Sequence, residues 1–331
     1  MSLCNEIKCF AKSKTDMLQY INWAENKKIQ LKLWTKAIRA PFFQAVVIPV
    51  MLGTAIAWHN TGIFHLAHFL LALIGALFVH AGTNLANDYF DYKGGTDNIN
   101  TEFTPFNGGS RVIQDSLISP KRICYAFVLF FGLGILIGLY FIWACGWPIL
   151  VFGGVGLLSG YFYTASPIRI GYRGWGELLV GLNFGPLVVL GAYYIQAETI
   201  SLEALLASVP IGFLMAAVLY INEFPDYYAD KSTNKNTLVV ILGRQKAIKG
   251  YYFLLVSAYL IIFLGVVAKM MPWLCLSSLF MVPLVWKSMR IATINYTSTE
   301  GLKPVMANTI AIHLTVGLLL SISYFVTRIF V

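Results

Sequence analysis

Charged residues are scarce in this sequence. Asp, Glu, Lys and Arg make up 12% of the 331 residues, and hydrophobic residues make up 58%, whereas about a quarter of an average soluble domain is charged. None of these four residue types occurs between Arg39 and Asp88, or between Arg122 and Arg169. A bilayer-spanning helix needs about 20 residues with few or no charges. The scarcity of charge therefore excludes an ordinary soluble domain and indicates that lipid surrounds much of the chain.

Cysteine and histidine patterns that bind metals are also missing from the sequence. The five cysteines, at positions 4, 9, 124, 145 and 275, form no Cys-x-x-Cys pair and no zinc-ligand spacing. The histidines at positions 59, 65 and 68 lie near the predicted membrane face opposite to the acidic clusters described below. We therefore do not expect these residues to be metal ligands.

Long uncharged runs recur along the chain and predict nine transmembrane helices. The two longest intervals can each hold two helices, with turns near His59–Gly62 and at Gly146-Trp147-Pro148. Single spans follow between Glu177 and Glu198, Glu203 and Glu223, Lys249 and Lys269, Lys269 and Lys287, and Lys303 and Arg328. Membrane β-barrels alternate apolar and polar residues in short segments, unlike these continuous runs. We expect an all-α polytopic membrane bundle of about nine helices.

Basic residues are concentrated on one predicted side of the membrane. If the N-terminus is cytosolic, the tail and the loops after helices two, four, six and eight hold 22 of the 24 Lys and Arg residues, which is the positive-inside pattern. The net charge of +9 then fixes topology and faces anionic lipid, and we do not expect nucleic-acid binding. In a prokaryote, the protein would lie in the inner membrane.

Two segments of different character are expected along the chain. Residues 1–39 carry many charges before any apolar run, which is the wrong order for a cleaved signal peptide. We expect residues 1–39 to be a cytosolic, amphipathic or partly disordered segment. Residues 40–331 are expected to form a single transmembrane domain.

The first of two acidic clusters ends predicted helix two. Ionisable groups beside the membrane interior are costly and usually functional. The cluster reads Asn84-Leu85-Ala86-Asn87-Asp88-Tyr89-Phe90-Asp91 and is followed by Asp97. Residues three or four apart share a helix face, so Asn84, Asp88 and Asp91 align.

The second acidic cluster ends predicted helix six. It reads Asn222-Glu223-Phe224-Pro225-Asp226 and is followed by Asp230. Like the first cluster, it contains the order Asn, acid, aromatic, any residue, Asp. Asn222 and Asp226 align on one face, and Asp230 joins them if the helix continues.

Stacked carboxylates repel one another unless a cation lies between them. Oxygen ligands without a His or Cys cluster favour Mg²⁺, which characteristically bridges carboxylates to substrate phosphates. A single cluster could equally mark a solvated helix end. Two matching clusters on the same predicted side instead favour two Mg²⁺-binding motifs that share one diphosphate.

Further polar candidates lie on the same side. Arg39, Arg111 and Arg169 could grip phosphate oxygens in a bidentate manner, although each could also be a basic anchor at a helix end. The ring face of Tyr163, at the end of helix four, could face an allylic cation, although a single aromatic residue could also belong to the membrane-interface belt or the core. The loop after helix two has nearly thirty residues, including two Gly-Gly pairs, which is typical of a lid.

These residues resemble the UbiA superfamily of intramembrane aromatic prenyltransferases, and within it the branch that prenylates 1,4-dihydroxy-2-naphthoate on the way to menaquinone. The resemblance is carried by Trp34 to Pro41, Asn84 to Asp97, Gly108 to Arg111, Tyr163 to Arg169, Tyr172 to Glu177 and Asn222 to Gly243. It implies a nine-helix bundle with a central cavity open to lipid, Mg²⁺ at both acidic motifs, and a cytosolic cap formed by the loops after helices two and six.

The resemblance also implies residue roles. The first metal motif would be Asn84, Asp88, Asp91 and Asp97, and the second would be Asn222, Asp226 and Asp230. The diphosphate would be contacted by Arg39, Arg111, Arg169 and the two motif asparagines, Asn84 and Asn222. Tyr163 would lie beside the reacting carbon. Asp91 follows Asp88 by three residues, whereas the commonest superfamily spacing is four. Either Asp91 or Asp97 therefore completes the first metal site.

The expected activity is Mg²⁺-dependent transfer of a polyprenyl group from its diphosphate to an aromatic acceptor through an allylic cation. The resemblance favours 1,4-dihydroxy-2-naphthoate, which would lose its carboxylate as carbon dioxide. Two alternatives stay open at this point. One is a sibling enzyme for 4-hydroxybenzoate, homogentisate, a porphyrin or a lipid alcohol; the other is a transporter, whose acids would bind a coupling ion near mid-membrane. Prenyl chain length and oligomeric state are not indicated.

Overall fold

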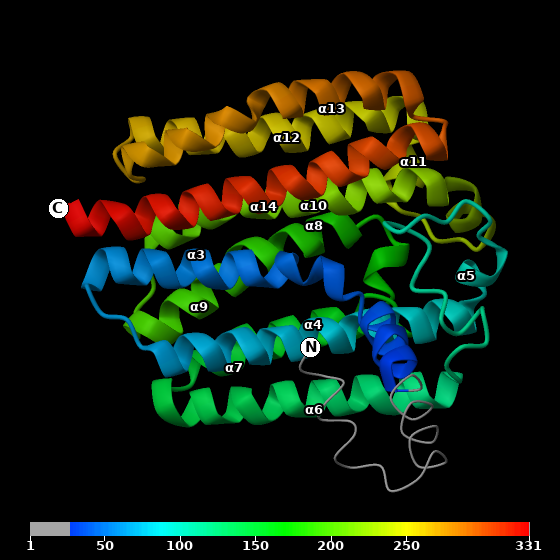
Figure 1. Cartoon of the computed structure of the whole chain (residues 1–331), viewed down its shortest axis with the longest axis horizontal. Helices are drawn as coiled ribbons and strands as arrows, with labels where there is room; N and C mark the ends of the chain where they lie inside the picture. The colour runs from blue at the N-terminus through cyan, green and yellow to red at the C-terminus, as the bar shows by residue number, and fades with distance from the viewer. Residues whose placement is uncertain (1–26, 331) are drawn as a thin grey trace, which may run out of the picture.

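The computed structural model describes residues 27–330, and within that range the chain is helical with no β-strand (Figure 1). The principal α-helices are α3 (Gln44–Thr61), α4 (Leu66–Gly94), α6 (Pro120–Cys145), α7 (Pro148–Phe162), α8 (Gly176–Leu182), α9 (Val188–Ala197), α10 (Leu202–Ser232), α12 (Arg244–Val267), α13 (Val282–Asn295) and α14 (Thr299–Phe330). The other elements are η1 (Ala40–Phe43), α5 (Thr96–Ile99), η2 (Ile170–Tyr172), η3 (Asn183–Leu187), α11 (Leu238–Leu242) and η4 (Trp273–Met281).

The predicted all-α membrane bundle is confirmed. Eight helical stretches in the described part of the chain are long and apolar enough to cross a membrane, counting η1 with α3, α8 with η3 and α9, and η4 with α13. The remaining predicted span corresponds to α7, an apolar helix of 15 residues. Large apolar side chains such as Trp143 and Phe280 lie on the outside of the bundle, more than 80% exposed, where lipid would surround them.

Glycine and proline set the helix ends as the sequence predicts. Gly62 follows α3 with a φ of 71°, a left-handed conformation that glycine adopts without strain. Gly146 ends α6, and Pro148 begins α7 at the first helical position, where a missing N–H is tolerated. These residues turn the chain back into the bundle.

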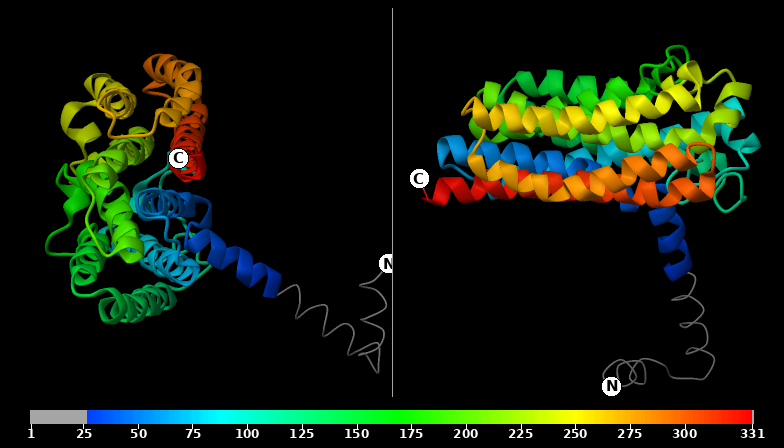
Figure 2. Two further views of the ribbon diagram at one scale, coloured as in Figure 1. Left: turned by 90° about the vertical axis from the view of Figure 1, so that its left-hand side faces the viewer. Right: turned by 90° about the horizontal axis from the view of Figure 1, so that it is seen from above.

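The helices lie side by side, with α6 at one edge of the bundle and α12 and α13 at the other (Figures 1 and 2). Helix α4 packs against α6, α3 against α9 and α14, and α10 against α12. The acidic ends of α4 and α10, together with α5 and α11, lie at the end of the bundle opposite to the C-terminus (Figure 1). The two acidic motifs, distant in sequence, are therefore brought to one end.

Residues 27–37 form a helix that leaves the bundle near that same end (Figure 2). Its Leu33 and Trp34 side chains pack against a cluster that includes Leu85 and Ala86 of α4. Residues 1–26 of the predicted N-terminal segment lie outside the described residues. Its cytosolic location and partial disorder remain predictions.

Close backbone contact fixes the segment η3, which is a π-helical turn between α8 and α9. A Cβ atom added to Gly185 would lie 2.8 Å from both the Gly212 Cα and the Ser208 carbonyl oxygen of α10. Small residues allow this approach, as they do at many helix interfaces in membranes. Extra π-helical residues of this kind occur frequently at functional sites.

Candidate active site

A cavity of about 1460 Å³ runs from the loop end of the bundle into its apolar interior. At the loop end its lining includes side chains of both acidic motifs. Farther in, the lining is largely apolar and includes Ala72, Phe141, Ile149, Phe152 and Ile195. Along α4 the lining extends from Asp91 to Ala72, a distance of roughly 28 Å at 1.5 Å per residue. The cavity can therefore hold a ligand with a charged head and a long hydrocarbon tail.

The first motif contributes Asn84, Asp91 and Asp97 to the cavity wall. The Asn84 side-chain amide donates to the Ile38 carbonyl at 3.0 Å, which leaves its oxygen toward other partners. The Asp91 carboxylate accepts a 2.7 Å hydrogen bond from the Tyr172 hydroxyl. These contacts hold the end of α4 against the segments that contain Ile38 and Tyr172.

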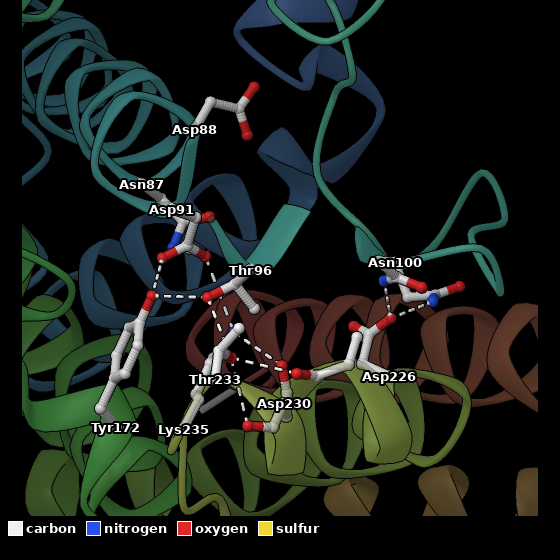
Figure 3. A network of polar contacts seen from close by, with 12 residues as sticks. Asn87, Asp88, Asp91, Thr96, Asn100, Tyr172, Asp226, Asp230, Thr233 and Lys235 are labelled. Carbon is white, nitrogen blue, oxygen red and sulfur yellow. Dashed lines mark hydrogen bonds and ion pairs between the residues drawn. The ribbon is translucent and has the colours of Figure 1, made fainter. Parts of the chain in front are cut away.

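Asp88 is placed differently from the rest of the first motif. Its carboxylate is buried and bonded to the Arg39 guanidinium and to the Ser110 hydroxyl. Asp88 is one contact away from the cavity, since Arg39 and Ser110 line it. Figure 3 shows the Asp88 side chain apart from the network that joins Asp91 to Asp230. In this arrangement Asp88 orients Arg39 and the part of the long loop around Ser110.

The second motif meets the long loop that follows α4. Asp226 accepts hydrogen bonds from the side-chain amides of Asn100, at 2.7 Å, and Asn107. Helix α10 continues past Asp226 to Ser232, so Asp230 lies on the same face, as the sequence predicts for a continuous helix. The loop after α4 therefore spans both acidic motifs.

Lys235 links the two motifs and was missed by sequence reasoning. Its ammonium nitrogen lies 3.6 Å from Asp91 Oδ2 and 3.4 Å from Asp230 Oδ1 (Figure 3). Tyr172, also missed, lies beside it and bonds both Asp91 and Thr96. A lysine five residues after the last acid of a motif was the available signal, but it reads equally well as a membrane anchor.

The three predicted arginines share an unusual backbone conformation. Arg39, Arg111 and Arg169 have φ values of 52°, 60° and 48°, and such left-handed residues cluster at functional sites. Arg39 and Arg111 line the cavity. Arg111 donates to the carbonyl oxygens of Asp97 and Asn100, both at 3.3 Å. Arg169 is exposed outside the cavity, with its guanidinium 5.4 Å from the ring centre of Tyr172.

Charge at the polar end of the cavity is unbalanced. Burial, reinforced by the charges of Asp91 and Asp88, raises the pKa of the Asp97 carboxyl to about 8. Burial alone would lower the pKa of the Lys235 ammonium, but the carboxylates of Asp230 and Asp91 outweigh it and hold that pKa well above its usual value. Neighbouring carboxylates contribute to both shifts. The end of the cavity is therefore suited to a further cation.

Side-chain oxygens at the acidic end of the cavity fit Mg²⁺, because they are hard ligands and several of them lack a hydrogen-bond partner in the described part of the chain. Asp97 Oδ2, Asn222 Oδ1 and Asp230 Oδ2 are buried and have no hydrogen-bond partner among residues 27–330, and hard oxygen ligands suit Mg²⁺. Within that same range, no three His, Cys, Asp or Glu side chains form a ready-made ligand cluster. Lys235 lies between the carboxylates of the two motifs instead.

Tyr163, which follows the last residue of α7, lines the cavity. A Cβ atom on Gly171 would lie 2.9 Å from its ring, and one on Gly176 would lie 3.1 Å from its hydroxyl. These two glycines allow the chain to pack closely around the ring. Tyr163 thus has a fixed place in the cavity wall.

The structure brings most of the predicted site residues into one cavity. Its lining contains Asn84, Asp91, Asp97, Asn222, Asp226, Asp230, Arg39, Arg111 and Tyr163. Asp88 is held directly behind Arg39, and Arg169 lies outside. Their roles in binding and catalysis stay predictions.

Comparison with known proteins identifies the family. The sequence model of the UbiA prenyltransferase family matches residues 46–308. The chain is 30% identical over 295 residues to 2-carboxy-1,4-naphthoquinone phytyltransferase of Synechocystis, covering 88% of this chain and 93% of the relative. It is 31% identical over 247 residues to 1,4-dihydroxy-2-naphthoate octaprenyltransferase of Bacillus subtilis, covering 73% and 76%.

A solved structure supports the fold. A UbiA homolog from Archaeoglobus fulgidus, bound to GPP and Mg²⁺, superimposes with a TM-score of 0.58 at 19% identity, covering 86% of this chain and 99% of that one. The family match covers most of the chain and assigns it to the transferases rather than to transporters. The chain is an integral, multi-pass membrane protein that belongs to the UbiA prenyltransferase family.

Proposed function

We propose that this protein transfers a polyprenyl group from a polyprenyl diphosphate to 1,4-dihydroxy-2-naphthoate in menaquinone biosynthesis. The main support is that one continuous cavity has an acidic end and a long apolar remainder, which match a diphosphate joined to a hydrocarbon chain. The names of the naphthoate-prenylating relatives favour this acceptor. We also propose that the N-terminus and the acidic end of the bundle are cytosolic, since most Lys and Arg residues lie on that side.

The polar end would bind the diphosphate head. Mg²⁺ would be held by Asn84, Asp91 and Asp97 of the first motif and by Asn222, Asp226 and Asp230 of the second, all of which line the cavity. When bound, it supplies positive charge that stabilises the departing diphosphate. Arg39 and Arg111 line the same end, and their guanidinium groups would contact phosphate oxygens directly. Asp88 would keep Arg39 in position through their ion pair.

The apolar walls would then protect the reacting carbon. As the allylic C–O bond breaks, its electron pair leaves with the diphosphate oxygen, and the prenyl group becomes an allylic cation. Excluding water from this region prevents hydrolysis of the cation. The ring of Tyr163 would face the cation and stabilise it electrostatically. An electron-rich ring carbon of the acceptor attacks, and its bond to the carboxylate breaks to release carbon dioxide.

The proposed function is tested with the full-length protein in membranes. Geranylgeranyl diphosphate and Mg²⁺ are supplied with 1,4-dihydroxy-2-naphthoate, and prenylated product and pyrophosphate are followed by mass spectrometry. We expect both products, and we expect a chelator to abolish them. Product with only 4-hydroxybenzoate, homogentisate, a porphyrin or a lipid alcohol would contradict the acceptor. Absence of product with every donor and acceptor would contradict the proposed function.

A further inference from the structure

His80 is a buried polar residue in the cavity wall that the steps above do not use. It lies on α4, and 8% of its surface is exposed. Its side chain lines the cavity. Neither ring nitrogen has a hydrogen-bond partner among residues 27–330. Burying an unpaired polar group in this way is unfavourable, so each such group in a folded protein calls for an explanation.

The orientation of the His80 ring is fixed by two aromatic neighbours. The ring makes edge-to-face contacts with Phe43, at a centroid distance of 5.8 Å, and with Phe184, at 5.3 Å. Phe184 belongs to the π-helical segment η3, which is held tightly against α10 at Gly185. A ring held from both sides presents its nitrogens in a constant direction. This suits a directional hydrogen bond to a ligand.

Other polar side chains at similar depth are satisfied within the protein. The Thr83 hydroxyl donates to the Val79 carbonyl at 2.9 Å. The Ser159 hydroxyl donates to the Asn183 side-chain oxygen at 3.1 Å. His80 differs from these residues because both of its ring nitrogens are free of such contacts in the described part of the chain. Unlike Thr83 and Ser159, His80 therefore keeps its hydrogen-bonding capacity free for a ligand in the cavity.

The depth of His80 indicates which substrate would reach it. His80 lies one helical turn from Asn84, or roughly 6 Å farther from the acidic end along α4. The diphosphate would be held at the acidic end, and a polyprenyl tail carries no hydrogen-bonding group. Of the parts of the two substrates, only the aromatic acceptor can place a polar substituent beside the reacting carbon and within this region.

We propose that His80 forms a hydrogen bond with a ring hydroxyl of the aromatic acceptor and so determines which acceptors bind. This inference rests on the proposed function and assigns it an acceptor-binding residue. Phe184 would form part of the same subsite by supporting the imidazole. A hydroxyl can donate to an unprotonated ring nitrogen or accept from a protonated one, according to the tautomer.

The test compares His80→Phe with a matched control, His313→Phe. His313 is also buried, with both ring nitrogens unpartnered within residues 27–330, but it lies on α14 and does not line the cavity. We expect His80→Phe to raise the KM for 1,4-dihydroxy-2-naphthoate roughly five- to tenfold, the effect of one lost hydrogen bond. The KM for geranylgeranyl diphosphate should not change. His313→Phe should leave both KM values unchanged.

Two further measurements separate binding from a structural effect. His80→Gln keeps a donor and an acceptor and should recover part of the acceptor affinity. The inhibition constants of 1-hydroxy-2-naphthoate and 4-hydroxy-2-naphthoate are then measured against wild type and His80→Phe. The analogue that lacks the contacted hydroxyl should bind both proteins equally. If His80→Phe does not accumulate in membranes, His80→Ala provides the same comparison.

Wild-type turnover of the naphthoate tests the proposed function by itself, so the two proposals can fail separately. An active wild type with an unchanged acceptor KM in the His80 variant would overturn the role of His80 and leave the function intact. An equal rise in the KM of donor and acceptor would also overturn it, because that result indicates a general disturbance of the cavity.

Discussion

Gly109 packs against the first acidic motif, and replacing it with alanine should damage activity more than stability. Its φ is +75°, and an added Cβ would lie 2.6 Å from Asp97 Oδ2 and 3.3 Å from Asp88 Oδ1. Ordinary van der Waals contact begins at 3.4 Å. The Asp97 carboxylate must therefore move by about 0.8 Å in Gly109→Ala to restore that contact.

The expected magnitudes differ for stability and for catalysis. Alanine in a left-handed conformation costs about 1–2 kcal/mol of folding stability. The displaced atom is the end of a flexible side chain, so the steric contact should add little to that cost. A misplacement near 1 Å at a reacting site can nevertheless lower a rate by about 100-fold. We expect a loss of roughly 10- to 100-fold in prenyl transfer.

Gly95→Ala is the matched control. Gly95 has a φ of +84° beside the same motif, and an added Cβ would meet nothing within 4 Å in the described chain. Both variants should lose similar thermal stability in detergent, measured as Tm, because both carry the same backbone strain. Only Gly109→Ala should lose activity in the membrane assay. Equal activity in the two variants would refute the reasoning that the Gly109 backbone positions catalytic carboxylates.

Two further predictions concern the cations of the site. Lys235→Met removes the charge between Asp91 and Asp230. In the presence of a chelator it should lower the stability of the protein by about 3–5 kcal/mol, the usual effect of breaking a buried ion pair, and added Mg²⁺ should recover part of that loss. An unchanged Tm in chelator would contradict the bridging role of Lys235. Arg111→Ala should raise the KM for the diphosphate donor roughly tenfold or more, whereas Arg169→Ala should change that KM little because Arg169 lies outside the cavity. Steady-state kinetics with varied donor concentration measure both effects. A larger rise in KM for Arg169→Ala than for Arg111→Ala would contradict the placement of the two arginines.

The spans of the bundle could be predicted because each depends on local composition. Uncharged runs marked the membrane helices, and Gly146 with Pro148 marked the break between α6 and α7. The continuation of α10 through Asp230 was left conditional, since Pro225 lies within the motif. The structure has Pro225 inside the helix, which places Asp226 and Asp230 one turn apart.

The acidic motifs were predictable, but their partners were not. Asn100 and Asn107 reach Asp226 across more than 100 residues of sequence, and no local pattern specifies such contacts. The same holds for Lys235 and Tyr172, which approach Asp91 from distant segments. These partners depend on how the loops fold over the ends of α4 and α10, and therefore on tertiary packing.

The position of Asp88 behind Arg39 could not be predicted from the sequence either. Helical spacing placed Asp88 on one face with Asn84 and Asp91, and that geometry holds. Whether a carboxylate on this face lines the cavity depends on Arg39 and Ser110, which cover it from two other segments.

The central claim is that both acidic motifs act together on one diphosphate. The most direct measurement compares pyrophosphate release and prenylated product for wild type, Asp88→Ala and Asp226→Ala in membranes, with Mg²⁺ and with a chelator. Membrane insertion is checked on the same samples. The account predicts chelator-sensitive turnover in wild type and its loss in each variant, with insertion intact. Turnover retained in both variants would contradict the claim.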